Sequence, residues 1–404
     1  MPGPLHGIRI IDVTTVLLGP YGTQLLGDLG ADVIKVEAPP SGDIARNMGT
    51  VRRPGMGGIY LNVNRNKRSL ALDLKQEAAK EVLRRLIRTA DVFVHNMRPQ
   101  AIERLGFGYA AVAALKPDII YVGAYGFGQQ GPYGTKPAYD DAIQAASGLA
   151  SLFARQDGTP RYVPTALADK LVGLMLSQAV AMALVHKLRT GEGQFVEVPM
   201  FETLVSFLLV EHLNGCAYVP PVGTMGYQRV ITAARRPFPT KDGYVCILPY
   251  SDTHWRKFFT AVGRPELMDD PRFATYRARI DSVDDLYGFV ASVTPQKTTA
   301  EWVALCDAAE IPCMPIINLE DLMEDPHLKA VGLFERHRHP SEGETVLVRS
   351  PVTFAKSPGT IRRHAPRFGE HSVEIARELG YDEAAIARLL ASGALLTPEA
   401  SPEA

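Results

Sequence analysis

Short apolar, β-branched segments alternate with helical segments from the start of the chain, and this alternation constrains the fold most strongly. Residues 8–13 and 31–37 have the pattern of strands, and the segment between them is helical and ends at Gly30. Further segments of the two kinds follow at 69–74, 76–90, 91–96, 101–106, 110–117, 118–126, about 169–190 and 194–200. Alternating strands and helices predict an α/β fold with an open, mostly parallel sheet covered by helices on both faces.

The character of the sequence changes after residue 200. Residues 1–200 form the predicted large domain, and a helical start followed by prolines and glycines makes 201–225 a connector. A smaller α+β domain is predicted at 226–325, with a hairpin over 235–250 that turns at 241–243. The C-terminal segment 326–404 carries a second hairpin at 336–350 and a last helix at 373–380, and we expect 394–404 to be frayed.

The composition excludes several classes of protein. Lys and Arg total 43 against 44 for Asp and Glu, so there is no basic excess for binding nucleic acid or a membrane surface. The longest apolar stretch, residues 171–185, is too short to span a bilayer and is expected to be a buried core helix. No signal peptide is recognisable, which favours the cytoplasm. The cysteines and histidines have no metal-ligand spacing, so no metal is predicted.

The glycine motif at 126–131 matches G-x-G-x-x-G and follows a predicted strand. A dinucleotide site also needs a helix that begins within the motif, because the pyrophosphate binds to free N–H groups at the helix N-terminus. Here Pro132 follows, and the turn after the first strand has no such glycines. The motif therefore predicts a loop that approaches a bulky ligand rather than a nicotinamide or flavin site.

Asp169 stands directly before the most apolar helical segment. From the residues alone it is first of all a helix cap, since Asp is among the best N-cap residues. The same location also suits a catalytic carboxylate, because a helix N-terminus stabilises the anion and carboxylates serve as covalent nucleophiles. A dispersed set of basic residues consists of Lys75, Arg98, Arg104 and Lys136. Of these, Lys75, Arg98 and Lys136 lie at or just beyond the ends of predicted strands, where ligands of open α/β sheets bind. Each of these could equally be a solvated surface charge.

Taken together, these segments resemble the family III CoA-transferases over nearly the whole chain. The resemblance is carried by Gly19-Pro20 with LLGDLGADVIKVE, by NKRS with LALDLK, by NMRP with IERLGFGY, by GFG with GPY, by the Ala168-Asp169 helix closed by RTGEGQ, by VEVPMFE and by DPHL. It implies an interlocked, ring-like homodimer in which each chain has a Rossmann-like large domain, a small domain and a C-terminal part that returns to the large one. It also implies a reaction without metal or organic cofactor, with coenzyme A thioester as substrate.

The resemblance also assigns roles to residues. Asp169 matches the catalytic aspartate, which would form a covalent aspartyl-CoA thioester during transfer of CoA from an acyl-CoA to a carboxylic acid. The turn at Val16 and Leu17 matches the place where backbone N–H groups would stabilise the oxyanion. The residues that match CoA-binding positions are Val16, Leu72, Lys75, Asn96, Met97, Arg98, Arg104, Lys136 and Tyr139.

Two questions stay open at the level of sequence. His212, Arg229 and Arg235 lie in and beyond the connector, where an arginine could clamp the distal carboxylate of a dicarboxylate such as succinate, or could form salt bridges between subunits. The alternative activity is that of an acyl-CoA isomerase, either a 2-methylacyl-CoA racemase or an enzyme of intramolecular CoA transfer. Tyr139 stands where the racemases carry a histidine, and a tyrosine is a poor base at neutral pH.

Overall fold

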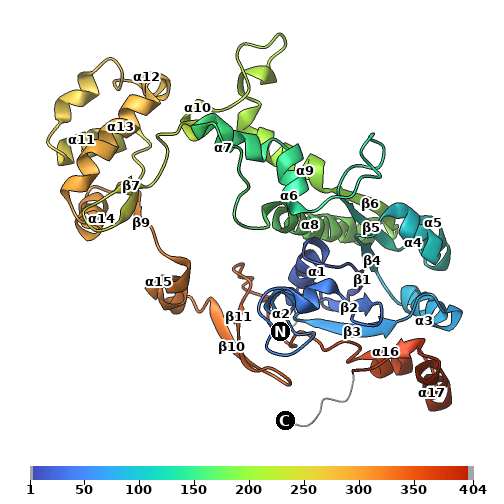
Figure 1. Ribbon diagram of the computed structural model, residues 1–404. Helices are drawn as coiled ribbons and strands as arrows, with labels where there is room; N and C mark the ends of the chain where they lie inside the picture. Colours follow the sequence, from blue (N-terminus) through green and yellow to red (C-terminus); the bar gives the residue numbers. More distant parts are fainter. Residues whose placement is uncertain (1–2, 399–404) are drawn as a thin grey trace. The chain divides into compact units, whose positions relative to one another are not determined.

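The computed structural model describes residues 3–398, which divide into two compact units (Figure 1). The first unit comprises the chain up to residue 147, residues 163–205 and the chain from 327 onward. The second comprises 148–162 and 206–326. The sequence places the connector at 201–225 and the small domain at 226–325, and these boundaries stay a prediction.

The described part of the first unit contains a seven-stranded sheet, in the order β12-β3-β2-β1-β4-β5-β6. Its strands are β1 (Arg9–Val13), β2 (Asp32–Glu37), β3 (Lys67–Leu72), β4 (Val92–His95), β5 (Ile120–Tyr125), β6 (Gln194–Pro199) and β12 (Leu395–Leu396). All neighbouring pairs among β1 to β6 are parallel. The predicted Rossmann-like parallel sheet is confirmed, and its strand order reverses direction between β1 and β4, the position at which such sheets bind ligands.

Helices cover both faces of this sheet (Figure 1). The helical elements outside the second unit, or shared with it at a boundary, are α1 (Leu18–Asp28), η1 (Ile44–Asn47), α2 (Gly58–Val63), α3 (Glu77–Arg88), α4 (Pro99–Leu105), α5 (Tyr109–Leu115), α6 (Asp140–Ala146), α8 (Leu167–Thr190), α9 (Met200–His212), α15 (Pro326–Ala330), α16 (Ser372–Glu378) and α17 (Glu383–Ala391). Side chains of α3, α5, α16 and α17 share one core with the strands, whereas α1 and α8 contact the sheet and each other. The predicted C-terminal hairpin forms as β10 (Phe334–His339) and β11 (Gly343–Val348).

The C-terminal tail is better ordered than the sequence predicts. Instead of fraying from Ala394, the chain adds β12 to the sheet, where Leu395 pairs with Leu72 in antiparallel register. Ala394 and Leu395 are buried. A two-residue strand offers no periodic pattern, so its signal is absent from the sequence. Residues 399–404 of the predicted frayed segment lie outside the described residues.

Helices α1 and α8 cross at two glycines. A Cβ atom on Gly22 would lie 2.8 Å from the carbonyl oxygen of Gly173, and one on Gly173 would lie 2.8 Å from that of Leu18. Neither separation is compatible with a side chain, so the helices approach more closely than other residues allow. Asp169 lies one turn before Gly173 on the same helix face. The crossing therefore brings the first turn of α8 to the start of α1.

The outer face of α8 differs from the prediction of a buried core helix. Its most apolar window is only 33% buried, and the helix is long and apolar enough to cross a membrane by length and composition, a test that core helices of soluble proteins also pass. The exposed apolar side chains recur at helical spacing: Leu174, Met175, Met182, Val185 and Leu188. The prediction was wrong because apolar composition alone does not distinguish burial within a chain from an unpartnered apolar face.

The second unit is α+β, as predicted for the smaller domain. Its elements are α7 (Leu149–Asp157), η2 (Asn214–Ala217), α10 (Gln228–Ile231), β7 (Phe238–Pro239), β8 (Tyr244–Ile247), α11 (Asp252–Ala261), η3 (Pro265–Asp269), α12 (Tyr276–Asp281), α13 (Val283–Val293), η4 (Thr294–Gln296), α14 (Thr299–Ala308), β9 (Cys313–Pro315) and η5 (Leu319–Glu324). The predicted hairpin forms, with Thr240 N–H donating to Gly243 O across the turn. Buried aromatic side chains, among them Phe258 and Trp302, fill its core.

Candidate active site

A cavity of about 210 Å³ lies in the first unit at the carboxyl ends of the parallel strands. Its walls come from the segments that follow β1, β4, β5 and β6, and from the first turns of α1 and α8. It thus coincides with the point where the strand order reverses, as expected for an open α/β sheet. The cavity brings together half of the site residues predicted from the sequence: Val16, Leu17, Asn96, Arg98, Lys136, Tyr139 and Asp169.

Asp169 is the acidic group of this cavity. It is the third residue of α8, whose N-cap is Ala166, so the interpretation as an N-cap is wrong. Among residues 3–398 its carboxylate has no hydrogen-bonding or ion-pair partner. Burial, together with the charge of Asp140, raises the pKa of Asp169 to about 7. The sequence argument expected the helix N-terminus to keep the group ionised, but desolvation outweighs that effect here.

Asp140 and Gln144, on α6, form hydrogen bonds that link the backbone of Asp169 to the backbone of Val163. Asp140 Oδ1 accepts a hydrogen bond of 2.9 Å from the backbone N–H of Asp169. Its Oδ2 accepts one of 2.5 Å from Gln144 Nε2, and Gln144 Oε1 accepts one of 2.9 Å from Val163 N–H. Both side chains are buried. Sequence reasoning missed this pair, although their spacing of four residues at a predicted ligand-binding edge was an available signal.

The turn between β1 and α1 lines the same cavity as Asp169. Val16 has a φ of +71°, and its N–H donates to Asp43 Oδ1 at 2.9 Å. The N–H of Leu17 has no hydrogen-bond partner among the described residues. Of the two backbone groups predicted to stabilise an oxyanion, Leu17 is therefore the available donor, because the N–H of Val16 is already used.

Two cations line the same cavity. Arg98 is the residue before α4, directly after β4, and Lys136 lies in the loop after β5 with its Nζ 4.1 Å from the centre of the Tyr133 ring. Neither has an acidic partner among the residues described. The cavity thus joins one raised-pKa carboxylate, one free backbone donor and two exposed cations, which suits an acyl ligand that carries phosphates.

Comparison with known proteins identifies the family. The sequence profile of CoA-transferase family III matches residues 5–372. The chain belongs to this family. It is 32% identical over 384 residues to succinate–glutarate CoA-transferase of Agrobacterium fabrum, covering 93% of this chain and 96% of the relative. It is also 32% identical over 420 residues to formyl-CoA:oxalate CoA-transferase of Afipia carboxidovorans, covering 98% of each.

The solved structure of a CAIB/BAIF family protein from Brucella suis is similar throughout. It superimposes with a TM-score of 0.79 at 31% identity and covers 94% of this chain and 100% of that one. The predicted family and fold class are confirmed, and so is the enzyme class: the protein is a CoA-transferase.

Four predicted CoA-binding residues do not line the cavity. Leu72 is wholly buried in β3 and Met97 packs against the core of the first unit, so their side chains stabilise the fold. Lys75 and Arg104 are exposed outside the cavity. Asn96 lines it, but both polar atoms of its amide are bonded to the backbone of Thr15. The contacts of these residues with CoA stay a prediction.

Further residues at the cavity were not predicted. Tyr125, at the end of β5, has its pKa raised to about 12 by burial, and its hydroxyl lies 3.4 Å from Nε2 of His95. Burial lowers the pKa of His95 to about 4, so this histidine is neutral near pH 7. Gln129 and Met200 complete the wall. Aromatic and apolar side chains at strand ends resemble ordinary core residues in sequence, which is why they were missed.

The glycine motif forms a loop, as predicted, and its approach to a bulky ligand stays a prediction. No helix begins within 126–131, and the chain stays irregular until α6. The N–H of Gly128 donates to Glu202 at 2.9 Å and that of Gln129 donates to Glu197 at 2.7 Å. Carboxylates therefore occupy N–H groups that would otherwise bind phosphate. The loop instead contributes Gly126 and Gln129 to the cavity wall of this CoA-transferase.

The residues proposed for a distal carboxylate belong to the second unit. His212 is buried, and its Nδ1 accepts a hydrogen bond of 3.2 Å from Tyr227 N–H. This side chain therefore stabilises the conformation of the segment between the two residues. The guanidinium carbon of Arg229 lies 4.7 Å from the centre of the Tyr250 ring. Arg235 is exposed. Of the three, Arg229 has the most defined surroundings.

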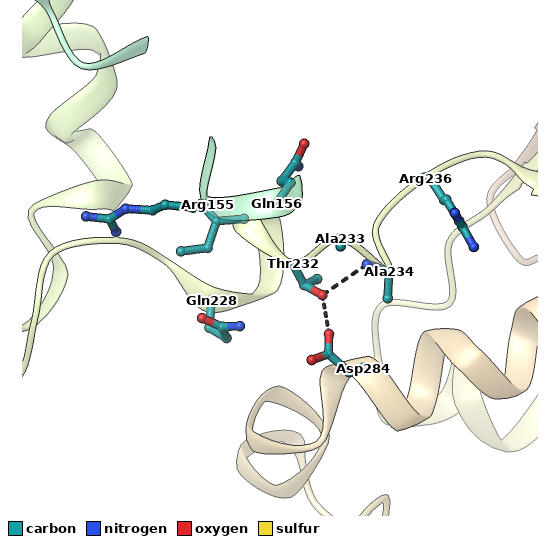
Figure 2. A pocket seen from close by; sticks show the side chains of 9 residues that line it. Arg155, Gln156, Gln228, Thr232, Ala233, Ala234, Arg236 and Asp284 are labelled. Carbon is teal, nitrogen blue, oxygen red and sulfur yellow. Dashed lines mark hydrogen bonds between the residues drawn. The ribbon is translucent and has the colours of Figure 1, made fainter. Parts of the chain in front are cut away.

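A larger cavity of about 720 Å³ also lies in the second unit, between α7, α10 and the start of α13 (Figure 2). The side chains of Arg155 and Arg236 extend to opposite sides of it in Figure 2, and Arg155 donates to Met225 O at 2.9 Å. Asp284 is bonded to the hydroxyl of Thr232. Because its charged groups do not converge, this cavity lacks the chemistry of the site at Asp169.

Among residues 3–398, no three His, Cys, Asp or Glu side chains gather as a metal ion would require.

Proposed function

We propose that the protein transfers CoA from an acyl-CoA to a carboxylic acid through a covalent aspartyl-CoA thioester on Asp169. The observation that carries the proposal is that one cavity is lined by both Asp169 and Leu17, whose carboxylate and N–H respectively have no hydrogen-bond partner among the described residues. The group on Asp169 has a pKa of about 7, so near neutral pH a large fraction is ionised and, being poorly solvated, is a strong nucleophile for a carboxylate.

The first half of the reaction loads CoA onto the enzyme. The carboxylate of Asp169 attacks the thioester carbonyl of the acyl-CoA, the C–S bond breaks, and a mixed anhydride and CoA thiolate result. The thiolate then attacks the aspartyl carbonyl, and the donor leaves as a carboxylate that carries one oxygen of Asp169. The activated acyl bond is preserved throughout, because each step exchanges one acyl derivative for another.

The second half transfers CoA to the acceptor. The acceptor carboxylate attacks the aspartyl thioester, the thiolate leaves, and it then attacks the acceptor carbonyl of the new anhydride. The products are acceptor-CoA and a free Asp169 carboxylate. Every attack places negative charge on a carbonyl oxygen, which a backbone N–H such as that of Leu17 stabilises without reorganisation. Arg98 and Lys136 are suited to the phosphates of CoA.

For the substrate we propose that one acid is a dicarboxylate such as succinate. Relatives from Agrobacterium fabrum and mouse carry names that specify succinate or succinyl-CoA and glutarate. A guanidinium binds a carboxylate through two parallel hydrogen bonds, which is the role that the sequence predicts for an arginine of this chain. The test is a set of paired mono- and dicarboxylate acceptors of equal length, and a preference for the monocarboxylates would contradict the proposal.

For the assembly we propose an interlocked homodimer. Its support is the apolar stripe on α8, formed by the exposed side chains of Leu174, Met175, Met182, Val185 and Leu188, because exposed apolar patches mark interaction surfaces. A partner subunit that covers this stripe would also explain why the apolar face of α8 is exposed within a single chain.

The experiment that tests Asp169 is trapping with hydroxylamine. The protein is incubated with succinyl-CoA and hydroxylamine, digested, and the peptides are analysed by mass spectrometry. Hydroxylamine cleaves an aspartyl thioester or anhydride to an aspartyl hydroxamate, so the modification is expected at Asp169 and is lost in Asp169→Ala. Asp141→Asn is the matched control, since Asp141 is exposed and does not line the cavity. Full turnover in Asp169→Ala would refute the assignment.

The same preparation separates transferase from isomerase. A racemase exchanges the proton on the α-carbon, so deuterium from solvent would enter an α-methyl acyl-CoA without any acceptor acid. Tyr139 stands at the position where the racemases carry a histidine, and a tyrosine is a poor base at neutral pH. We therefore expect no deuterium uptake.

A further inference from the structure

Side chains hold the turn that follows β1 through hydrogen bonds to the backbone N–H and C=O groups of Thr14 and Thr15. The N–H of Thr14 donates to Asp12 Oδ1 at 2.9 Å, and its carbonyl oxygen accepts from Lys35 Nζ at 2.8 Å. The N–H and C=O of Thr15 are both bonded to the amide of Asn96, at 3.0 and 2.9 Å. The side chains that hold the turn thus come from β1, β2 and the end of β4.

Val16 needs this support because its backbone is strained. It is a β-branched residue with a φ of +71°, a conformation that L-residues with branched side chains strongly disfavour. Asp43 Oδ1 accepts from the N–H of Val16 at 2.9 Å and from that of Ala45 at 2.9 Å. Its Oδ2 lies 2.8 Å from Lys35 Nζ as an ion pair, and neither side chain has any exposed surface.

We propose that the buried Lys35–Asp43 pair is a positioning device that holds Val16 in the left-handed conformation, so that the N–H of Leu17 is presented to the acyl carbonyl at Asp169. Lys35 binds the carbonyl of Thr14 and Asp43 binds the N–H of Val16, so the pair closes around the turn. The inference rests on the proposed function, since it assumes that the N–H of Leu17 acts on the oxyanion.

A role in stability alone does not account for this pair. Burying an ammonium and a carboxylate costs desolvation that their attraction does not generally exceed, and apolar residues of similar volume often fill such sites equally well. What an apolar pair could not supply is the hydrogen-bond donor for Thr14 and the acceptor for Val16 that define the turn. Both groups act through Val16 and Leu17 and do not themselves line the cavity.

The test is a double-mutant cycle between Asp43 and Val16. Asp43→Ala is expected to lower kcat about 10- to 100-fold, because a misplaced donor loses most of its effect in the transition state. The KM for succinyl-CoA should change less than about threefold, since Arg98 and Lys136, the cations proposed for the phosphates of CoA, lie in other segments of the chain. In the Val16→Gly background the same substitution should cost less than about threefold in kcat, because glycine adopts a positive φ without strain.

A second variant guards against an unpaired buried charge. Lys35→Met with Asp43→Ala removes both charges of the pair, while the neighbouring buried carboxylates keep their own cations, Asp12 with Lys67 at 2.9 Å and Glu37 with Arg46 at 2.7 Å. This variant should fold with the same loss of kcat and the same partial rescue by Val16→Gly. A folded variant with unchanged kcat would overturn the proposal, and so would a loss of equal size in both backgrounds. Failure of the Lys35→Met, Asp43→Ala variant to fold would also overturn the proposal, because the pair would then be needed for folding itself. Asp169→Ala, assayed in parallel, separates failure of the aspartyl mechanism from failure of the turn.

Discussion

At the scale of single residues, the chemistry depends on a carboxylate that the fold makes costly to ionise. Asp169 has its pKa raised to about 7, first by burial and second by Asp140. A carboxylate nucleophile must be deprotonated to react, yet a higher pKa also makes it more nucleophilic once it is ionised. The site thus combines a useful ionised fraction near neutral pH with strong nucleophilicity.

The pH dependence of turnover follows from this pKa. In the free enzyme kcat/KM should rise with pH through an inflection near 7, because only the ionised Asp169 attacks. Asp140→Asn removes a neighbouring charge and should shift the inflection to lower pH, although burial keeps it above the ordinary value for Asp. A profile of kcat/KM from pH 5 to 9 for both proteins checks this, and an inflection unmoved by Asp140→Asn would count against the pairing.

The same group should reduce stability when it is ionised. A raised carboxyl pKa means that the folded state binds the proton more tightly than the unfolded state, so the cost grows from about pH 4 and is complete above about pH 7. Asp169→Asn is therefore expected to raise the free energy of unfolding by about 1–3 kcal/mol at pH 8, after allowance for partial solvent exposure, and by much less at pH 4. Thermal unfolding at the two pH values measures this, and equal effects at both would be inconsistent with the shift.

Residue-level reasoning from the sequence located Asp169 but not its environment. The resemblance to the family was enough to locate Asp169, because one of the matching motifs contains it. Its position before a predicted helix suggested a helix cap that stays ionised. The pKa depends instead first on burial and second on α6, which brings Asp140 to the backbone of Asp169 from a separate part of the chain. Likewise, nothing local in the sequence shows that Asp43 occupies the N–H of Val16, since the two are joined only by the folding of η1 beside the turn.

At the scale of elements, the crossing of α1 and α8 determines where the nucleophile lies. Gly173→Ala would place a Cβ atom 2.8 Å from the carbonyl of Leu18, so the helices must separate. We expect a loss of about 1–3 kcal/mol in unfolding free energy and at least about a tenfold loss of kcat.

The matched control for this substitution is Gly288→Ala on α13. No atom lies within 4 Å of a Cβ atom built there, and alanine favours a helix over glycine by about 0.5–1 kcal/mol. This variant should be as stable as the parent or slightly more so, with unchanged activity. Equal destabilisation by the two substitutions would mean that the contact between α1 and α8 does not require glycine at position 173.

Elements with strong periodicity were predictable, and elements defined by their partners were not. The strands β1 to β6 and both hairpins follow from alternation and turn residues. The two-residue β12 exists only because β3 offers an open edge, and the outer face of α8 is uncovered although its composition indicates burial. In both cases the decisive contact is tertiary and leaves no local pattern.

At the scale of the whole molecule, the apolar stripe on α8 predicts self-association. Leu188→Glu and Met182→Glu each place a charge on the stripe, and we expect either to weaken the dimer at least about tenfold, since a buried unpaired charge costs several kcal/mol. Sedimentation equilibrium of the two variants and the parent measures the dissociation constant. A parent that is monomeric at micromolar concentration would remove the basis for the proposed dimer.

The central claim is that Asp169 itself takes part in acyl exchange, and oxygen tracing tests it most directly. When the acceptor acid carries ¹⁸O in its carboxylate, each transfer leaves one labelled oxygen on the aspartyl carboxylate. In the next turnover one of the two oxygens of that carboxylate leaves with the donor acid, so label accumulates in the donor acid over several turnovers. After turnover with labelled acceptor, mass spectrometry of the digested protein should find ¹⁸O in the peptide that contains Asp169 and in the released donor acid. Label confined to the acceptor-CoA product, or oxygen from solvent water in the donor acid, would contradict the account.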